Sequence, residues 1–322
     1  MPASPPLPII FGIPGLELEP EWTRFFQKVT PFGFILFARN LRDPEQARRL
    51  VGQLREVCDR EEVAILIDEE GGRVQRLPKP PWPTFPAARA LAQEAEAQGA
   101  SASERVRDNY LRLGGELQQL GITVNAAPVA DLALPGAHQV IGDRAFSSDP
   151  LQVAELARAC AEGLRDAGVM PIVKHLPGYG RAQVDPHEEL PVVREAEAFL
   201  QQSDFLPFQH LADLPWGMTS HLLFPQLDPE WPVTLSPTII SRVIREWIGF
   251  DGLLVTDCLF MKALSGTVPE RVQRCLEAGC DLALHSHGEL PELQEAALGL
   301  QPISDRSWDR WERARAWLKE RS

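Results

Sequence analysis

The chain has 322 residues, of which 44% are hydrophobic, and its formal net charge at pH 7 is −13. So negative a surface argues against a nucleic-acid or membrane partner. The sequence has no apolar run of the roughly 18 residues that a membrane helix needs, and no signal-peptide pattern at its start, so we expect a cytoplasmic protein. The five scattered cysteines fit free, buried thiols better than a metal site.

Eight apolar segments are predicted to be strands, each followed by a stretch long enough for a helix. The strands are Pro8–Gly12, Phe32–Phe37, Val63–Ile67, Ile122–Val124, Pro171–Val173, Trp216–Met218, Leu253–Val255 and Asp281–Leu284. The helices are Glu19–Lys28, Pro44–Val57 behind the N-cap Asp43, Ser101–Leu120, Leu151–Ala167, Glu195–Leu211, Ser236–Ile248, Pro269–Ala278 and Ser307–Leu318. Pro78–Pro86 is too broken by proline for regular structure.

This alternation is typical of an α/β fold, either a (β/α)8 TIM-type barrel or a doubly wound sheet. Polar residues at the carboxyl ends of the predicted strands favour the barrel, because there they meet at one mouth. They are Arg39, Asp68, Asn125, Lys174, His175, His221, Asp257 and His285. We therefore predict one barrel domain spanning residues 1–322.

The segment from Lys174 to His187 carries the densest group of reactive side chains. Lys174 and His175 end a predicted strand, and Pro177, Gly178 and Gly180 then make a bendable loop that leads to Asp185 and His187. A carboxylate beside an imidazole can orient the ring and stabilise its cation, which suits a His for proton transfer. A surface loop with incidental charges is the alternative interpretation.

Asp257 follows a predicted strand with no basic residue near it in sequence, so its carboxylate could attack an anomeric carbon. The alternative interpretation, less favoured, is a helix N-cap for the segment after it. Asp68 precedes Gly71 and Gly72, which let a ligand approach closely but would also suit a simple tight turn. Side-chain donors suited to several hydroxyl groups complete the set and point to a sugar: Arg144, Lys174 and His175.

Four ordered stretches resemble glycoside hydrolase family 3, in particular its single-domain bacterial β-N-acetylglucosaminidases of cell-wall recycling. They are residues 67–76 (IDEEGGRVQR), 141–146 (IGDRAF), 174–187 (KHLPGYGRAQVDPH) and 249–257 (GFDGLLVTD), with a weaker match at 218–221 (MTSH). The resemblance implies a barrel enzyme that acts on a small carbohydrate, derived from muropeptides, as a monomer without metal or organic cofactor.

Carried over by position, the resemblance also implies roles for individual residues. Asp257 is similar to the family's catalytic nucleophile, and His187 with Asp185 resembles the acid–base pair of this subgroup. The positions that match sugar-binding residues are Asp68, Arg76, Arg144, Lys174 and His175. The implied reaction is retaining hydrolysis through a covalent ester on Asp257.

The chain departs from the family pattern at several positions. Tyr179 stands where the family loop usually has His, and Arg181-Ala182 where it often has Asp-Thr. Cys258 follows the nucleophile position, where Asp or Ala is common, and residues 284–287 (LHSH) replace a more apolar strand end. These departures affect the leaving-group side and the exact substrate more than the chemistry.

Three alternatives stay open from the sequence. The same fold and mechanism could act on another β-glycoside, such as an unsubstituted glucoside. The chain could also bind a sugar without turning it over. Least favoured is a metal-dependent barrel of the amidohydrolase type, because such barrels place a His-x-His pair on the first strand rather than the last. Its ligands would be His285, His287, His221, Lys174 and Asp257.

Overall fold

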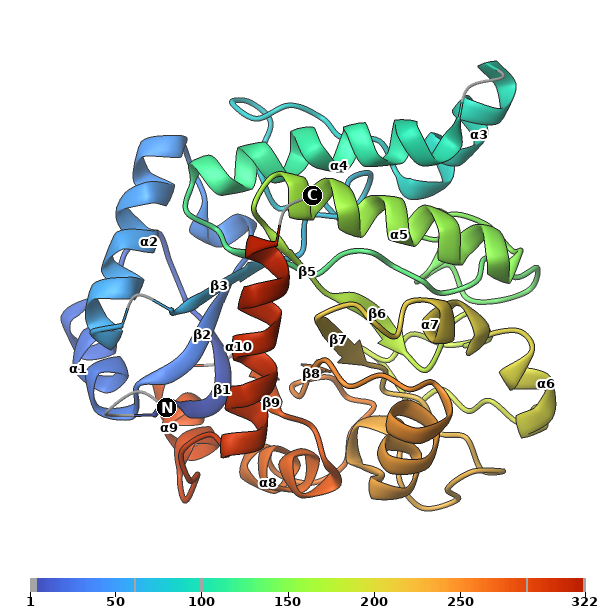
Figure 1. Cartoon of the computed structure of the whole chain (residues 1–322). Helices are drawn as coiled ribbons and strands as arrows, with labels where there is room; N and C mark the ends of the chain where they lie inside the picture. Colours follow the sequence, from blue (N-terminus) through green and yellow to red (C-terminus); the bar gives the residue numbers. More distant parts are fainter. Residues whose placement is uncertain (1–4, 61, 99–100, 288, 321–322) are drawn as a thin grey trace.

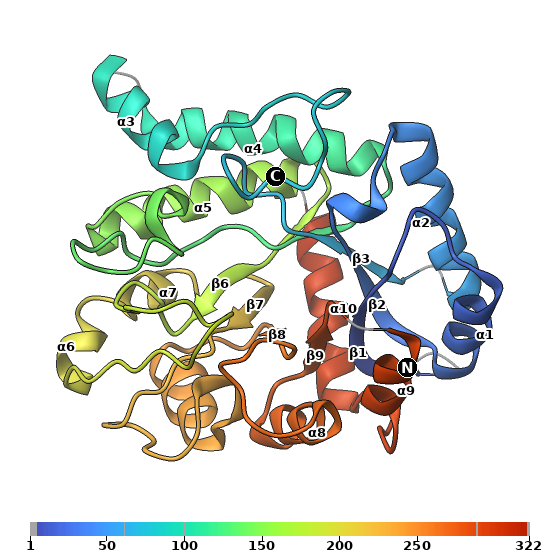
Figure 2. The same cartoon turned by 180° about the vertical axis from the view of Figure 1, so that it is seen from behind.

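A computed structural model describes residues 5–60, 62–98, 101–287 and 289–320. Its sheet is parallel throughout, in the order β5-β4-β3-β2-β1-β9-β8-β7-β6 (Figures 1 and 2). The strands are β1 (Leu7–Gly12), β2 (Pro31–Leu36), β3 (Ala64–Ile67), β4 (Val124–Asn125), β5 (Met170–Pro171), β6 (Val173–Leu176), β7 (Trp216–Thr219), β8 (Leu253–Cys258) and β9 (Leu282–His285).

The two ends of this sheet belong to one continuous segment. Only Ile172 separates β5 from β6; β5 pairs with β4, whereas β6 pairs with β7. The chain itself therefore closes the sheet, and β5 and β6 together act as the fifth of eight barrel strands. The predicted (β/α)8 TIM-type barrel is confirmed. That residues 1–322 form one domain stays a prediction, since the range includes undescribed residues.

Helices surround the strands. They are α1 (Pro20–Val29), α2 (Pro44–Cys58), α3 (Ala88–Gln98), α4 (Ala102–Gln119), α5 (Pro150–Asp166), α6 (Glu197–Gln201), α7 (Leu206–His210), η4 (Ile239–Trp247), α8 (Val268–Ala278), α9 (Leu290–Ala297) and α10 (Asp305–Lys319), with short turns η1 (Ala38–Asn40), η2 (Gly142–Arg144) and η3 (Val233–Leu235). The long helices α4 and α5 lie side by side (Figure 1). Gly163 allows this close approach, because a Cβ there would lie 2.3 Å from the Arg107 carbonyl oxygen.

Two helix predictions need correction. The predicted helix Glu195–Leu211 is wrong as a single element: α6 and α7 are separate, and Pro207, which has no N–H to donate, lies in the first turn of α7. The sequence also gave no sign of α3, which follows the proline-rich stretch. The predicted N-cap at the start of α2 is confirmed, since the Asp43 carboxylate accepts a hydrogen bond from the Gln46 N–H.

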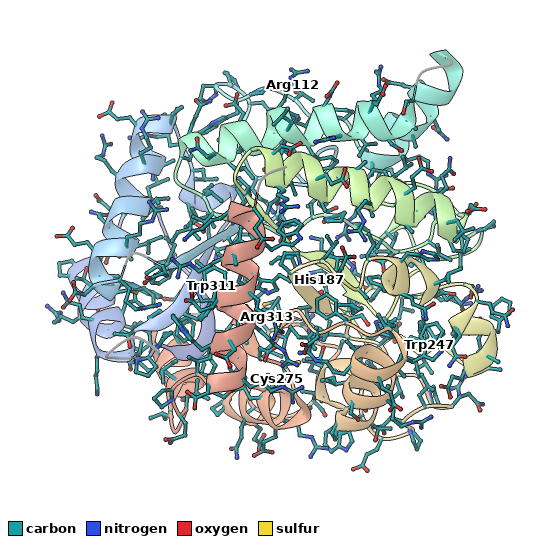
Figure 3. The ribbon with its side chains drawn as sticks, in the orientation of Figure 1. Arg112, His187, Trp247, Cys275, Trp311 and Arg313 are labelled. Atoms are coloured by element: carbon teal, nitrogen blue, oxygen red, sulfur yellow. The ribbon has the colours of Figure 1, made fainter. Side chains whose placement is uncertain are left out.

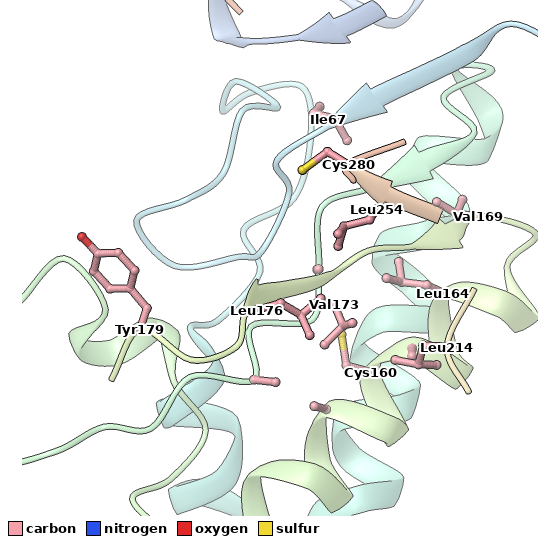
Figure 4. Packing of buried hydrophobic residues seen from close by; sticks show 14 of the residues in the cluster. Ile67, Cys160, Leu164, Val169, Val173, Leu176, Tyr179, Leu214, Leu254 and Cys280 are labelled. Carbon is pink, nitrogen blue, oxygen red and sulfur yellow. The ribbon is translucent and has the colours of Figure 1, made fainter. Parts of the chain in front are cut away.

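Hydrophobic residues pack on both sides of the barrel wall. Outside it, Cys160 of α5 lies beside Val173 of β6 (Figure 4). Inside it, Trp311 of α10 packs against Phe32 and Trp216, at ring-centroid distances of 5.2 and 5.5 Å, so α10 forms the floor of the barrel (Figure 3). All five cysteines are buried and free. No helix within the described ranges is long and apolar enough to span a bilayer.

Candidate active site

A cavity of about 430 Å³ opens above the carboxyl ends of the strands. Side chains alternate along a strand, so a residue two positions after an interior one also points toward the barrel interior. Asp68, Lys174 and Asp257 each stand two residues after an interior side chain of the barrel, namely Leu66, Ile172 and Val255 respectively. This alternation directs all three into the cavity. All eight predicted site residues line it: Asp68, Arg76, Arg144, Lys174, His175, Asp185, His187 and Asp257.

Five alternating charges cover one wall of the cavity. The buried Lys174 ammonium contacts Asp68 at 2.8 Å and Glu70 at 2.7 Å. Arg144 binds both carboxylate oxygens of Glu70 at 2.8 Å, and Arg76 lies 3.6 Å from Asp68. Burial disfavours a charged Glu70, but Arg144 and Lys174 outweigh it and hold the pKa of that carboxyl well below its usual range. This wall has three cations and two carboxylates, so some of its N–H groups are available to donate hydrogen bonds to hydroxyl groups.

His175 is held by a fully buried carboxylate. The Asp131 Oδ2 atom lies 2.6 Å from His175 Nδ1, and Oδ1 accepts hydrogen bonds from the backbone N–H groups of His175 and Tyr179, at 3.3 and 2.7 Å. With Nδ1 engaged, Nε2 is the ring nitrogen that can contact a ligand. The imidazole is therefore oriented before any sugar arrives.

Asp257 and His187 present the reactive groups. The Asp257 carboxylate is half-buried, accepts a hydrogen bond from the Cys258 N–H at 2.7 Å, and has no ion-pair partner in the part of the chain that the structure describes. His187 Nδ1 lies 2.7 Å from Asp185 Oδ1, which also accepts the His187 backbone N–H at 2.9 Å. Burial works against ionisation of Asp185, but these hydrogen bonds lower the pKa of its carboxyl overall. The ionised Asp185 carboxylate can therefore stabilise a proton on the His187 ring.

Comparison with known proteins places this cavity in a family. The model of the glycosyl hydrolase family 3 N-terminal domain matches residues 24–301, most of the chain. The chain belongs to glycosyl hydrolase family 3. This confirms the predicted family and makes the amidohydrolase alternative wrong.

Relatives of this family 3 chain share most of its length. A β-hexosaminidase from Alkalilimnicola ehrlichii is 36% identical over 304 residues, which cover 92% of this chain and 86% of that protein. The NagZ structure from Neisseria gonorrhoeae in complex with N-trifluoroacetyl-D-glucosamine is 30% identical, covers 100% of this chain and 96% of its own, and has a TM-score of 0.88.

A family 3 β-N-acetylglucosaminidase from a Paenibacillus species is 33% identical with a TM-score of 0.87. The match covers 97% of this chain but only 61% of that longer one. Together with the preceding matches, it confirms the predicted enzyme class, that of the β-N-acetylhexosaminidases.

The sequence analysis expected all the polar strand-end residues of this family 3 barrel to meet at its mouth. Four of them do not line the cavity. The Asn125 side-chain amide accepts a hydrogen bond from the Glu69 N–H and donates one to the Glu69 carbonyl oxygen. Arg39 donates to the carbonyl oxygens of Ile13 and Ser286. His221 is buried and contacts Thr234 and the carbonyl of Cys258, while His285 is fully buried beside Phe260. Within the described ranges, no three His, Cys, Asp or Glu side chains converge as a metal site would require.

Sequence reasoning missed other side chains that shape the site. Glu70 forms ion pairs with both Lys174 and Arg144. The predicted site had three cations and only one sugar-binding carboxylate, which was a signal for a second acid in the motif at residues 67–76. Asp131 ends the largely apolar segment 126–131 after β4, but nothing local to the sequence linked it to His175. The cavity-lining Phe260 and His287 gave no signal of a shared location.

Proposed function

We propose that the chain hydrolyses terminal β-N-acetylglucosaminides with retention of anomeric configuration. The observation that carries this proposal is the single cavity in which an unpaired carboxylate and an imidazole–carboxylate pair face a wall of hydroxyl-binding groups. Relatives named β-hexosaminidase, and a structural neighbour in complex with an N-acylglucosamine, support the choice of sugar.

In this proposal Asp257 is the nucleophile. Its carboxylate attacks the anomeric carbon and forms an ester as the glycosidic bond breaks, while protonated His187 gives its proton to the leaving oxygen. Neutral His187 then takes a proton from the water that attacks the same carbon and releases Asp257. Asp185 orients the ring and stabilises its cation through the 2.7 Å contact.

The charged wall would bind the sugar hydroxyl groups. Asp68 offers carboxylate acceptors, and the cations Arg76, Arg144 and Lys174 offer donors. His175 adds Nε2. Because their mutual ion pairs already fix these groups, little side-chain freedom is lost on binding.

We further propose that the substrate derives from peptidoglycan muropeptides, and that the protein acts in the cytoplasm as a monomer without a cofactor. The resemblance of the sequence motifs to cell-wall recycling enzymes supports the source. Five free thiols are compatible with a reducing compartment.

A panel of aryl β-glycosides tests the substrate. We expect the N-acetylglucosaminide to be cleaved much faster than the glucoside, with β-configured sugar released first. Faster cleavage of the glucoside would overturn the sugar assignment. Binding of N-acetylglucosamine without turnover of any glycoside would favour the sugar-binding alternative.

Covalent labelling tests the nucleophile. A slow 5-fluoro glycosyl donor should label the peptide that contains Asp257. Asp257→Asn should lower kcat by several orders of magnitude while N-acetylglucosamine still binds. Label on Glu69 or Glu70 would contradict the assignment.

A further inference from the structure

Two departures from the family pattern, far apart in the sequence, meet at one rim of the cavity. Cys258 Sγ lies 2.8 Å from Ser286 Oγ, and Ser286 Oγ lies 2.9 Å from His287 Nδ1. Cys258 and Ser286 are both buried. This chain of contacts fixes the plane of the His287 ring.

The fixed imidazole stacks on an exposed aromatic ring. The rings of Phe260 and His287 lie 5.3 Å apart and only 17° from parallel, and Phe37 packs against His287 from another side at 6.0 Å. Phe260 is 46% exposed, although exposing so large an apolar side chain has no benefit for folding. All three rings line the cavity. They form an aromatic wall, held in place and open to a ligand.

This aromatic wall is joined through the backbone to the loop that carries His187, the proposed proton donor to the leaving group. The Ala263 N–H donates to the Pro186 carbonyl at 3.1 Å, so the backbone next to His187 is joined to the segment that carries Phe260. His187 and His287 line the same cavity, and burial together with the Arg39 charge lowers the pKa of His287. In the proposed mechanism, the group that protonates the leaving oxygen therefore lines the cavity next to the segment that carries these rings.

We propose that Phe260 and His287 form a leaving-group subsite that stacks on the ring of the sugar released by the reaction. The C–H groups on the face of a pyranose pack well against an aromatic surface. The inference deepens the proposed function and rests on it. It makes Phe260 and His287 specificity-determining residues, held next to the departures from the family pattern at Cys258 and residues 284–287.

Two substrates with the same N-acetylglucosaminyl group test the subsite. N,N′-diacetylchitobiose releases a pyranose, whereas methyl β-N-acetylglucosaminide releases methanol. Phe260→Ala should lower kcat/KM for the disaccharide about tenfold, the loss expected for one good aromatic contact. It should leave the methyl glycoside within about twofold, because methanol has no ring to stack. His287→Ala should behave alike, and Phe260→Trp should restore cleavage of the disaccharide.

Phe199→Ala is the matched control, since Phe199 is an equally exposed phenylalanine (51%) outside the cavity. It should change neither substrate. An equal loss on both substrates in Phe260→Ala, or no loss on either, would overturn the subsite while leaving the glycosidase assignment intact. If the unaltered enzyme cleaved neither compound, the proposed function would fail and the subsite with it.

Discussion

His187 differs from the other proposed catalytic groups in its exposure to solvent. Its side chain is 63% exposed, against 28% for Asp185. The side chains of the charged wall are less exposed to solvent than His187, and that of Lys174 is only 2% exposed. A proton donor in this position matters in proportion to how poorly the leaving group departs on its own.

We therefore predict that His187→Ala lowers kcat/KM for natural disaccharides by about 10²–10⁴-fold. With a dinitrophenyl glycoside, whose leaving group needs no proton, the first glycosylation step should be nearly unaffected. Pre-steady-state measurement of that step separates the two cases, and Asp185→Ala should repeat the pattern more mildly. Equal losses on both substrates would assign His187 a binding or structural role and direct the search for the acid to Glu188 and Glu189.

Glu69 stands between Asp68 and Glu70 but has a different environment. It is fully buried, and its Oε2 accepts hydrogen bonds from the backbone N–H groups of Arg76 and Leu77, at 2.7 and 3.1 Å. Burial raises the pKa of the Glu69 carboxyl from 4.5 to about 7, and these hydrogen bonds offset that only in part. The folded protein therefore holds this proton more tightly than the unfolded chain does.

A carboxyl with a raised pKa contributes stability below its unfolded pKa, and that contribution is lost as pH rises through the folded one. For Glu69 this window runs from 4.5 to about 7, equivalent to about 3 kcal/mol. Glu69→Gln, neutral at every pH, should lose less unfolding free energy than the wild type between pH 4.5 and 7.5 in urea titrations. Glu295→Gln, on an exposed position of α9, is the control. A parallel fall in Glu69→Gln and wild type would disprove the buried titration.

At the scale of elements, α10 joins the barrel through both aromatic and ionic contacts. Besides Trp311, its Arg310 donates to Asp281 at 2.9 Å, and Asp281 also accepts from Arg245 at 2.8 Å. Asp281 itself is buried just before β9. The helix is therefore part of the core, at the end of the barrel opposite to the cavity.

Trp311→Ala should destabilise the protein by about 3–5 kcal/mol, because it removes a large buried ring and leaves a cavity beside Phe32 and Trp216. Trp311→Phe should cost clearly less. Chemical denaturation gives both values. Since the catalytic cavity is remote, kcat/KM measured well below the melting temperature should stay within about twofold of wild type. A large loss of activity in a folded Trp311→Ala protein would show that the floor supports the site.

For the whole molecule, periodicity and strand-end polarity sufficed to predict the barrel, because each strand had a clear apolar run and each helix a clear face. They failed where local rules compete. Helix α3 follows a stretch, residues 78–86, that contains five prolines. The predicted 195–211 helix contained Pro207, whose effect depends on the chain turning at Ser203 and Asp204. The change of partner between β5 and β6 is a property of barrel closure that a single strand does not encode.

The site likewise contains residues that the sequence could place and residues that it could not. Residues two positions after interior strand residues, such as Asp68, Lys174 and Asp257, could be placed from alternation alone. Glu70 and Asp131 could not, because their roles arise from contacts with residues 74 and 44 positions away in sequence. The aromatic pair of Phe260 and His287 likewise exists only once β8 and β9 lie side by side.

Among the residues that the structure describes, the exposed large apolar side chains come from several elements and loops. They are Leu111, Leu151, Val192, Phe199, Phe260 and Leu298. A stable homodimer usually buries a continuous apolar area. We predict a monomer, and sedimentation at micromolar concentration should give the mass of one chain at all loadings. A concentration-dependent mass would contradict this.

The position of α10 also matters while the protein is being made. Phe32 and Trp216 leave the ribosome well before Trp311, which covers them in the folded barrel. Since domains begin to fold during synthesis, a nascent chain that has completed all its strands still presents an aromatic surface at the base of its barrel. Until α10 emerges, that surface is available to chaperones and to neighbouring nascent chains. The synthesis of α10 therefore determines when the aromatic surface is covered.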